Sequence, residues 1–212
     1  MKRSIYLIVF VFSASLFFGC GEKKESPADE LTNHPKDLKE FADKMKEVSE
    51  GLTEGKKVNP VDFRELKALL PEAIANLKRT NIEGEKVGTM GMNVSTANAD
   101  YSNEGNDKSI DLKITDLGNI SGISGLAAYG WYMVDIDKED ESGYEKTITF
   151  KGNKAFEKYN NENQSGELNV LVAKRFVVEA NGYHVSMNEI KAAAEMIDFG
   201  KLESWKDFGV EQ

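Results

Sequence analysis

The chain has 212 residues, of which 40% are hydrophobic and 30% are charged, and these fractions are typical of a globular protein. Its formal net charge is -9, and the sequence contains no basic patch that would offset the repulsion from phosphates, so we expect no nucleic-acid partner. The length predicts one domain of roughly 150 residues with extensions. The only cysteine is Cys20, so a disulfide within the chain is excluded.

The first 20 residues have the organisation of an export signal. Lys2 and Arg3 form a charged start, and residues 5–18 form an apolar stretch that is interrupted only by two serines. This stretch is typical of a secretory signal and is too short to span a bilayer comfortably. Residues 16–20, Leu-Phe-Phe-Gly-Cys, complete it, and they resemble the lipobox of bacterial lipoproteins.

The resemblance to bacterial lipoproteins implies how the chain is anchored. A diacylglycerol is attached to the thiol of Cys20, a peptidase removes residues 1–19, and the new amino group is acylated. Several acyl chains hold a protein on a membrane, whereas a single chain binds only marginally. Gly21, in place of an aspartate, implies the outer membrane if the cell is Gram-negative. An ordinary cleaved signal and an uncleaved anchor are the alternatives to this lipid-anchored envelope location.

The mature chain begins with a tether and a helix. Residues 21–35 are charged and contain no aromatic side chain, so residues 20–35 are predicted to be a lipidated cysteine followed by a flexible tether. Residues 36–212 are then a single domain. Its first helix, over residues 36–55, is peripheral and carries one apolar stripe at helical spacing. We expect the stripe to pack on the domain, because two heptads are too few for a coiled coil. The stripe consists of Leu38, Phe41, Met45, Val48 and Leu52.

The remaining pattern predicts strands between helices. Asn59 and Pro60 begin a helix that ends at Pro71. Alternation predicts an antiparallel hairpin of residues 90–101 and 110–115, and then four short strands at residues 147–150, 154–159, 168–173 and 176–180. Ser186 and Glu189 form a capping box for a helix that Gly200 ends. The fold class is therefore α+β, a mainly antiparallel sheet of about six strands with helices packed on it. It resembles the α+β sandwiches of PsbP-like and related envelope domains.

Chemical motifs are scarce. The two histidines are His34, in the predicted tether, and His184, in a turn before the capping box. No zinc signature and no nucleophile elbow is present in the sequence, so we expect neither an enzyme nor a cofactor. The glycine-rich stretch 118–125 follows a strand and precedes a helix. It either lets that helix approach the sheet or presents amides to an anion, and the first alternative is favoured.

An acidic cluster follows at residues 135–141. Asp135 and Asp137 have the spacing of the first ligands of a calcium loop, and they are the candidate metal ligands. Asp140 stands where that loop requires glycine, and the glutamate at its twelfth place is missing. The pattern therefore favours a solvated charge run with weak calcium binding or none.

The most distinctive segment is residues 120–136, which carries no charge from Ile120 to Val134. We expect a buried helix here, after the glycine-rich loop, because a helix that is apolar nearly all round is usually enclosed. Two other readings are contact with a membrane surface and a groove for a hydrophobic ligand or a partner. The groove would be lined by Tyr129, Trp131, Tyr132 and Met133.

The sequence as a whole predicts a non-enzymatic lipoprotein of the cell envelope. It is attached to the membrane through Cys20, and its domain binds a protein, a lipid or another small ligand. A structural subunit of an envelope complex is the main alternative, and an envelope enzyme is the other.

Overall fold

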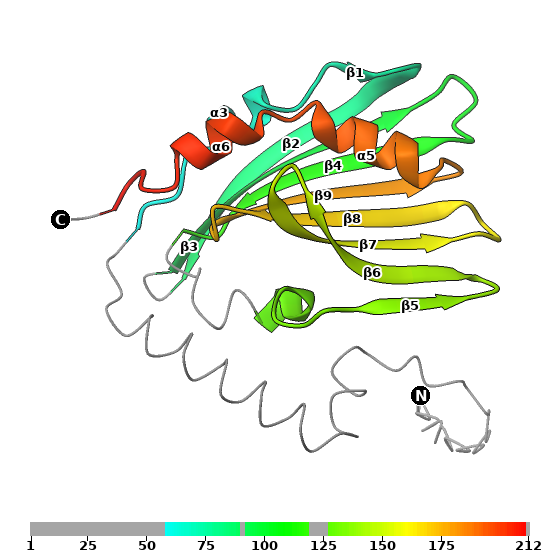
Figure 1. The fold of residues 1–212 in the computed structure, drawn as a ribbon. Helices are drawn as coiled ribbons and strands as arrows, with labels where there is room; N and C mark the ends of the chain where they lie inside the picture. Colours follow the sequence, from blue (N-terminus) through cyan, green and yellow to red (C-terminus); the bar gives the residue numbers. More distant parts are fainter. Residues whose placement is uncertain (1–57, 90–91, 119–126, 211–212) are drawn as a thin grey trace, which may run out of the picture.

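The computed structural model describes residues 58–89, 92–118 and 127–210 (Figure 1). The expected signal peptide (residues 1–19), the expected tether (residues 20–35) and the helix expected over residues 36–55 lie outside these ranges. The helices that are described are short, and none has the length and apolarity that crossing a membrane requires.

One antiparallel sheet dominates the described residues, with the strand order β1-β2-β3-β4-β9-β8-β7-β6-β5 (Figure 1). It contains nine strands, so the predicted sheet of about six strands with helices packed on it is wrong for this chain. The helices are few and short beside the sheet. The strands are β1 (Ala73–Ile74), β2 (Leu77–Thr89), β3 (Met92–Ser102), β4 (Ser109–Asp116), β5 (Asp137–Asp140), β6 (Gly143–Phe150), β7 (Asn153–Asn160), β8 (Ser165–Val172) and β9 (Phe176–Tyr183).

The strands that the sequence did not predict lack an apolar alternation. In β2 the large aliphatic residues are Leu77, Ile82 and Val87, which are five positions apart and cannot all share a face of a strand. All four residues of β5 are charged and exposed, and β1 has only two residues. Ile74 and Leu77 are buried in the core, but β1 is too short to show an alternation, and β5 and residues 81–89 of β2 are held mainly by backbone pairing to their neighbours. The strand count therefore exceeds the prediction.

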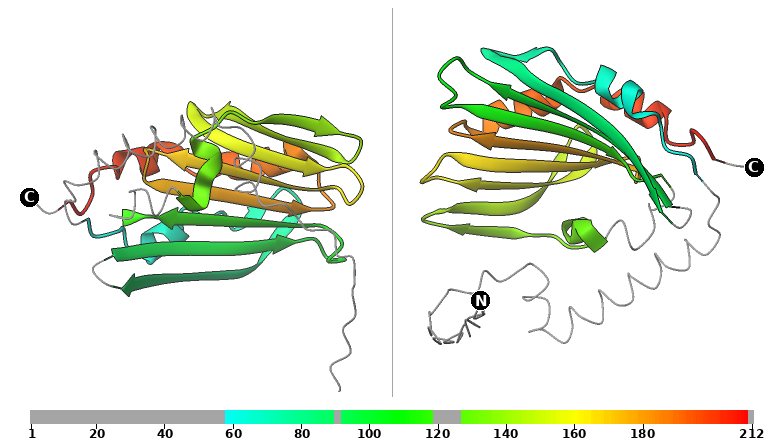
Figure 2. Two further views of the ribbon diagram at one scale, coloured as in Figure 1. Left: turned by 90° about the horizontal axis from the view of Figure 1, so that it is seen from below. Right: turned by 180° about the vertical axis from the view of Figure 1, so that it is seen from behind.

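The α-helices lie against one face of the sheet: α3 (Phe63–Ala68), α5 (Met187–Glu195) and α6 (Phe199–Ser204) (Figures 1 and 2). Alternate residues of the central strands point toward them and are buried, for example Leu112, Val170 and Val178. Ile190 of α5 and Leu202 of α6 complete this core, and neither side chain is exposed. Burial of apolar area of this kind is the main force that holds helices to a sheet.

Close packing of α5 depends on Gly182 of β9. A Cβ at this position would lie 2.4 Å from Val185 Cγ2 and 2.6 Å from Ile190 Cγ1. The predicted capping box of α5 is confirmed, because the Ser186 hydroxyl accepts from the Glu189 amide and the Glu189 carboxylate accepts from the Ser186 amide. The helix ends at Glu195, however, and a separate helix, α6, follows it.

The helix predicted to begin at Asn59 begins four residues later. Asp62 caps α3 by accepting from the Arg64 amide at 2.8 Å. Asn59 instead donates its backbone N–H to Gly209 O at 2.9 Å. Val58 and Val210 form an isolated bridge beside it, so the start of the described chain is joined to its end.

Candidate functional site

The face of the sheet opposite the α-helices carries a polar ladder, since residues paired across neighbouring strands lie on the same face. The strand registers align one residue from each strand between β2 and β5. This row contains mixed charges and amides. In spatial order its members are Asn81, Asp100, Asp111, Asn181, Glu167, Lys158, Glu145 and Lys138.

Two carboxylates of the ladder, Asp100 and Asp111, are directly paired. The amide groups of Asn81 and Asn98 donate to the Asp100 carboxylate at 3.2 and 3.0 Å. The pKa of the Asp111 carboxyl group is raised, mainly because the group is partly buried and also because the Asp100 charge lies close to it. Like charges placed directly opposite each other in this way are destabilising.

The other end of the ladder contains ion pairs. Lys158 of β7 contacts Glu145 of β6. A further ion pair lies in the middle of the sheet, in the row beside the ladder, where Lys113 Nζ of β4 is 2.7 Å from the Glu179 carboxylate of β9. Burial raises the pKa of Glu167, the charges of Glu145 and Glu179 add to the shift, and Lys158 opposes it. Partly exposed pairs of this kind contribute little stability each, so the ladder mainly determines the charge pattern of this face.

An aromatic cluster covers one end of the same face. Trp131 and Tyr132 belong to the short 3-10 helix η3 (Ala127–Tyr132) and pack against a small group of buried residues. The Trp131 ring stacks on Phe156 with a centroid distance of 6.2 Å and contacts the edge of Tyr132 at 6.3 Å. The buried residues below are Leu117, Leu171 and Val177.

The predicted helix over residues 120–136 can be compared with the structure in its second half. A helix running to residue 136 is wrong, because η3 ends at Tyr132 and β5 begins at Asp137. Residues 119–126 and the side chain of Tyr129 lie outside the description. Of the four predicted groove residues, Trp131 and Tyr132 are brought together and are partly buried. Met133 is also partly buried.

The largest polar feature that the sequence did not reveal is a buried ion pair between Asp116 and Arg175. Asp116 also accepts from the backbone amides of Val61 and Gly118, each at 2.8 Å. Arg175 donates through Nη1 to the carbonyl oxygens of Trp205, Lys206 and Phe208 at 3.0, 3.1 and 2.7 Å. The network uses these groups to connect chain segments that are distant in the sequence, so we assign it a structural role.

A second buried carboxylate lies on the helix side of the sheet. Glu157 of β7 is 1% exposed, with Lys146 Nζ 3.2 Å from one oxygen and Lys191 Nζ 2.5 Å from the other. Burial and then the neighbouring Glu157 raise the pKa of Tyr144 to about 12. Lys191 belongs to α5, so this cluster attaches the helix to β6 and β7.

The predicted calcium ligands do not converge. The Asp135 carboxylate lies 2.9 Å from Lys154 Nζ, and Asp137 is an exposed residue of β5. Asp140 accepts from the hydroxyl and the amide of Ser142, which lower the pKa of its carboxyl group. Within the described ranges, no group of three His, Cys, Asp or Glu residues could hold a metal ion.

His184 lies in the turn between β9 and α5, before the capping box, as predicted. Its Nδ1 is 2.8 Å from Asp107 O, and its ring stacks on Tyr183 with a centroid distance of 4.0 Å. Its backbone has a φ of +54°. These contacts connect the turn to the β3–β4 loop, and they give the imidazole a structural role. His34 lies outside the described residues.

The glycine-rich stretch is described only at its first residue. Gly118 has a φ of +53°, and a Cβ there would lie 2.7 Å from Asn93 O. The position therefore requires glycine for backbone geometry and close packing. Its amide is already bound to Asp116, so it is not available to an anion.

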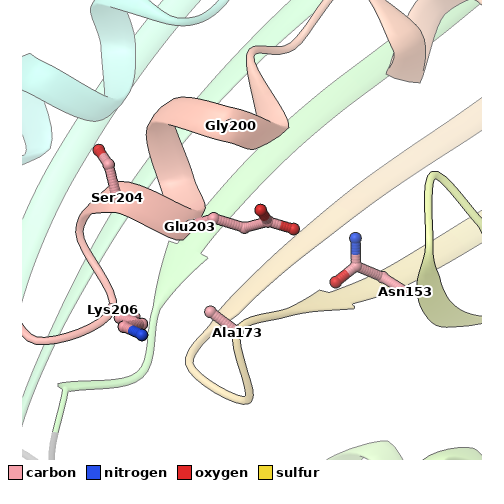
Figure 3. Close-up of a pocket in the computed structure, with 6 residues that line it drawn as sticks. All are labelled: Asn153, Ala173, Gly200, Glu203, Ser204 and Lys206. Carbon is pink, nitrogen blue, oxygen red and sulfur yellow. The ribbon is translucent and has the colours of Figure 1, made fainter.

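A shallow, open depression lies between α6 and the turns after β6 and β8 (Figure 3). Glu203 extends toward Asn153, whereas Ser204 points away from it (Figure 3). The Ser204 hydroxyl donates to Lys201 O at 2.7 Å, so it is used within the helix. The other lining residues are Ala173, Gly200 and Lys206. Nothing in this lining pairs a nucleophile with a base.

Comparison with protein-family models, with curated proteins and with solved structures finds no match for this chain.

Proposed function

We propose that this chain is a lipid-anchored envelope protein whose folded domain is a non-enzymatic module that binds a protein partner. The lipobox-like residues 16–20 support the anchor, together with the charged start and the apolar stretch before them. Through Cys20 the membrane is the first partner. In a Gram-negative cell Gly21 favours the outer membrane.

The observation that carries the binding role is the two-sided construction of the sheet. The described α-helices bury one face (Figure 2). The opposite face presents the polar ladder and, in another row of the same face, Trp131 and Tyr132. Partly exposed aromatic side chains beside charged and amide groups are typical of protein interfaces. The depression beside α6 and the one formed by Asp140, Glu141, Ser142 and Glu162 are both open to solvent, whereas small-molecule sites are usually enclosed and apolar. A protein partner therefore suits this surface better than an enclosed ligand.

Catalysis is not proposed. Among the described residues, the Nδ1 atom of His184 is bound to Asp107 O and its ring stacks on Tyr183, and no described contact pairs the ring with a serine hydroxyl. A general base needs to lie within hydrogen-bond reach of the group it activates.

The anchor is tested in the cell that makes the protein. The wild type should incorporate labelled palmitate and sediment with membranes. Cys20→Ser should lose both properties, while Ser26→Ala, a matched change in the same stretch, should retain them. Equal labelling of wild type and Cys20→Ser would refute the anchor. Cross-linking on intact cells, followed by purification of the wild type, should then yield a discrete protein adduct, and recovery of the protein without any adduct would refute the binding role.

A further inference from the structure

The outer side of β2 is an open strand edge in the described part of the chain. β1 pairs with β2 only through Leu77 and Lys78, and the next residue, Arg79, bonds to the segment before β1. Beyond a register shift at Arg79, residues 81–89 pair without interruption with β3 on the inner side. No described backbone group bonds to the outer side of residues 81–89. We call this stretch the β2 edge.

The β2 edge differs from the other edge of the sheet. β5 has four residues, each charged and exposed, three acidic and one basic. Charge and shortness are the usual protection of an edge strand against pairing. The β2 edge is longer than β5, contains no proline, and carries Ile82 and the 55% exposed Val87. Its amides and carbonyls are therefore the less protected template for another strand.

The charges of the β2 edge are segregated by face, with Glu83 and Glu85 on one face and the exposed Lys86 on the other, near the end of the strand. Glu83 and Glu85 are exposed on the polar-ladder face, in register with Asn98 and Thr96 of β3. A strand that paired with β2 would place side chains directly opposite these glutamates, where an opposite charge stabilises and a like charge destabilises. The chain is also acidic overall, which favours the approach of a basic segment.

The other face of the β2 edge offers an apolar contact. Ile82 is partly buried there, and Gly84 lies under Phe63 of α3, since a Cβ on Gly84 would be 2.8 Å from Phe63 Cδ2. A side chain opposite Gly84 would meet this ring rather than open solvent. The two faces together define an extended segment with basic residues at alternate positions and apolar residues between them.

We propose that the β2 edge docks an extended segment of a partner protein, which adds to the sheet as a further strand and places basic side chains opposite Glu83 and Glu85. Main-chain hydrogen bonds would hold the segment, and the alternate side chains would select it. This inference names the kind of partner for the binding role proposed above, but it does not depend on the lipid anchor.

A second copy of the chain fits the β2 edge poorly. Two β2 edges paired antiparallel about residue 84 would bring Glu83 opposite Glu85, and registers centred on residue 83 or 85 would bring a glutamate opposite itself. Like charges directly opposite each other are destabilising. A basic partner segment avoids this repulsion in each of these registers.

The test uses the mature lipidated protein in a non-ionic detergent and an eight-residue peptide of alternating Lys and Val. The wild type should bind the peptide, and hydrogen exchange of the amides in residues 81–89 should slow. The double variant Glu83→Lys with Glu85→Lys should bind about tenfold more weakly and should now bind a Glu-Val peptide. The control variant Glu141→Lys with Glu162→Lys makes the same charge change at two exposed turn positions away from the β2 edge. It should leave the affinities for the Lys-Val and Glu-Val peptides unchanged.

A peptide with the same sequence but N-methylated backbone amides keeps its charges and cannot form the strand pairing. It should not bind. The inference is overturned if the Lys-Val peptide does not bind, if the N-methylated peptide binds equally well, or if protection appears away from residues 81–89. It is also overturned if sedimentation shows that the wild type dimerises through the β2 edge. Peptide binding by a protein that fails the palmitate test would refute only the anchor.

Discussion

Asp116 and Arg175 form a two-point ion pair inside the protein, with Nε donating to Oδ1 at 2.8 Å and Nη2 donating to Oδ2 at 2.7 Å. The Asp116 side chain is 0% exposed and the Arg175 side chain 5% exposed. Both ions have lost their water, and backbone amides and carbonyls have replaced it. A pair in this setting contributes stability only while both partners are present.

We expect Asp116→Asn to lower the free energy of unfolding by about 3–5 kcal/mol, because it leaves the buried guanidinium without its counter-charge. Urea denaturation would measure the loss. Asp207→Asn, at an exposed position, should change stability by less than about 0.5 kcal/mol. The double variant Asp116→Asn with Arg175→Met should be more stable than Asp116→Asn alone. A loss below about 1 kcal/mol for Asp116→Asn would contradict the assignment.

Trp131→Ala should destabilise the protein by about 2–3 kcal/mol, which is less than the loss of about 3–5 kcal/mol for a core aromatic, because the ring is only partly buried. The lost contacts are those with Phe156 and Tyr132. Trp131→Phe should retain most of the stability, and Met196→Ala, at a 49% exposed position, should have little effect. If Trp131→Ala keeps full stability and abolishes the binding of an apolar dye that the parent binds, then Trp131 lines a groove.

The stability should depend on pH through Asp111. Its folded-state pKa is raised by burial and by Asp100, so its stabilising contribution is complete below the unfolded-state pKa of about 4 and is lost as the pH rises through the folded-state value. Asp111→Asn remains neutral and should raise the free energy of unfolding at pH 7 by about 0.5 kcal/mol, with no gain at pH 3.

Asp107 provides a control of opposite sign for this pH experiment. The Asn103 amide lowers the pKa of the Asp107 carboxyl group, so its contribution is present at neutral pH and is lost on acidification through the folded-state pKa. Asp107→Asn should therefore destabilise the protein at pH 7. An equal response of both variants in urea titrations at the two pH values would contradict the assignment.

Limited proteolysis of the mature protein should first cut residues 21–35, because their composition provides too little apolar surface for a packed structure. The remaining fragment should begin between residues 33 and 60, and mass spectrometry would identify it. Cuts within residues 92–118 should be late, since β3 and β4 are paired on both sides. An early cut there would contradict the domain boundary.

The elements that the sequence predicted are those with local signals. The β3–β4 hairpin follows from the alternation of Ile110, Leu112 and Ile114 with polar residues and from the turn before them. The four strands predicted at residues 147–150, 154–159, 168–173 and 176–180 correspond to β6, β7, β8 and β9. They and the Ser186–Glu189 capping box are signalled in the same way, by residues a few positions apart. Such patterns depend only on the period of the backbone.

What the sequence could not reveal depends on partners that are distant along the chain. Asp116 and Arg175 are 59 residues apart, and no spacing rule relates them. One signal was present, because Asp116 continues the row of Ile110, Leu112 and Ile114 that points into the core. A carboxylate in such a row must be paired when it is buried. The charged strand β5 and the β2 edge gave no signal, because they have no buried row.

The sheet order has a consequence for how the chain folds. Within each of the runs β1–β4 and β5–β9, neighbouring strands are also neighbours in sequence, and only the pairing of β4 with β9 joins the runs. We call the β4–β9 pairing the seam. Forming the seam brings together residues as distant in the sequence as Ser109 and Tyr183, so it is the step of sheet formation with the largest loss of chain entropy. Before closure, both seam strands expose pairing edges rich in Ile and Val. The interval between synthesis of β4 and of β9 is therefore when the nascent chain is most prone to aggregate.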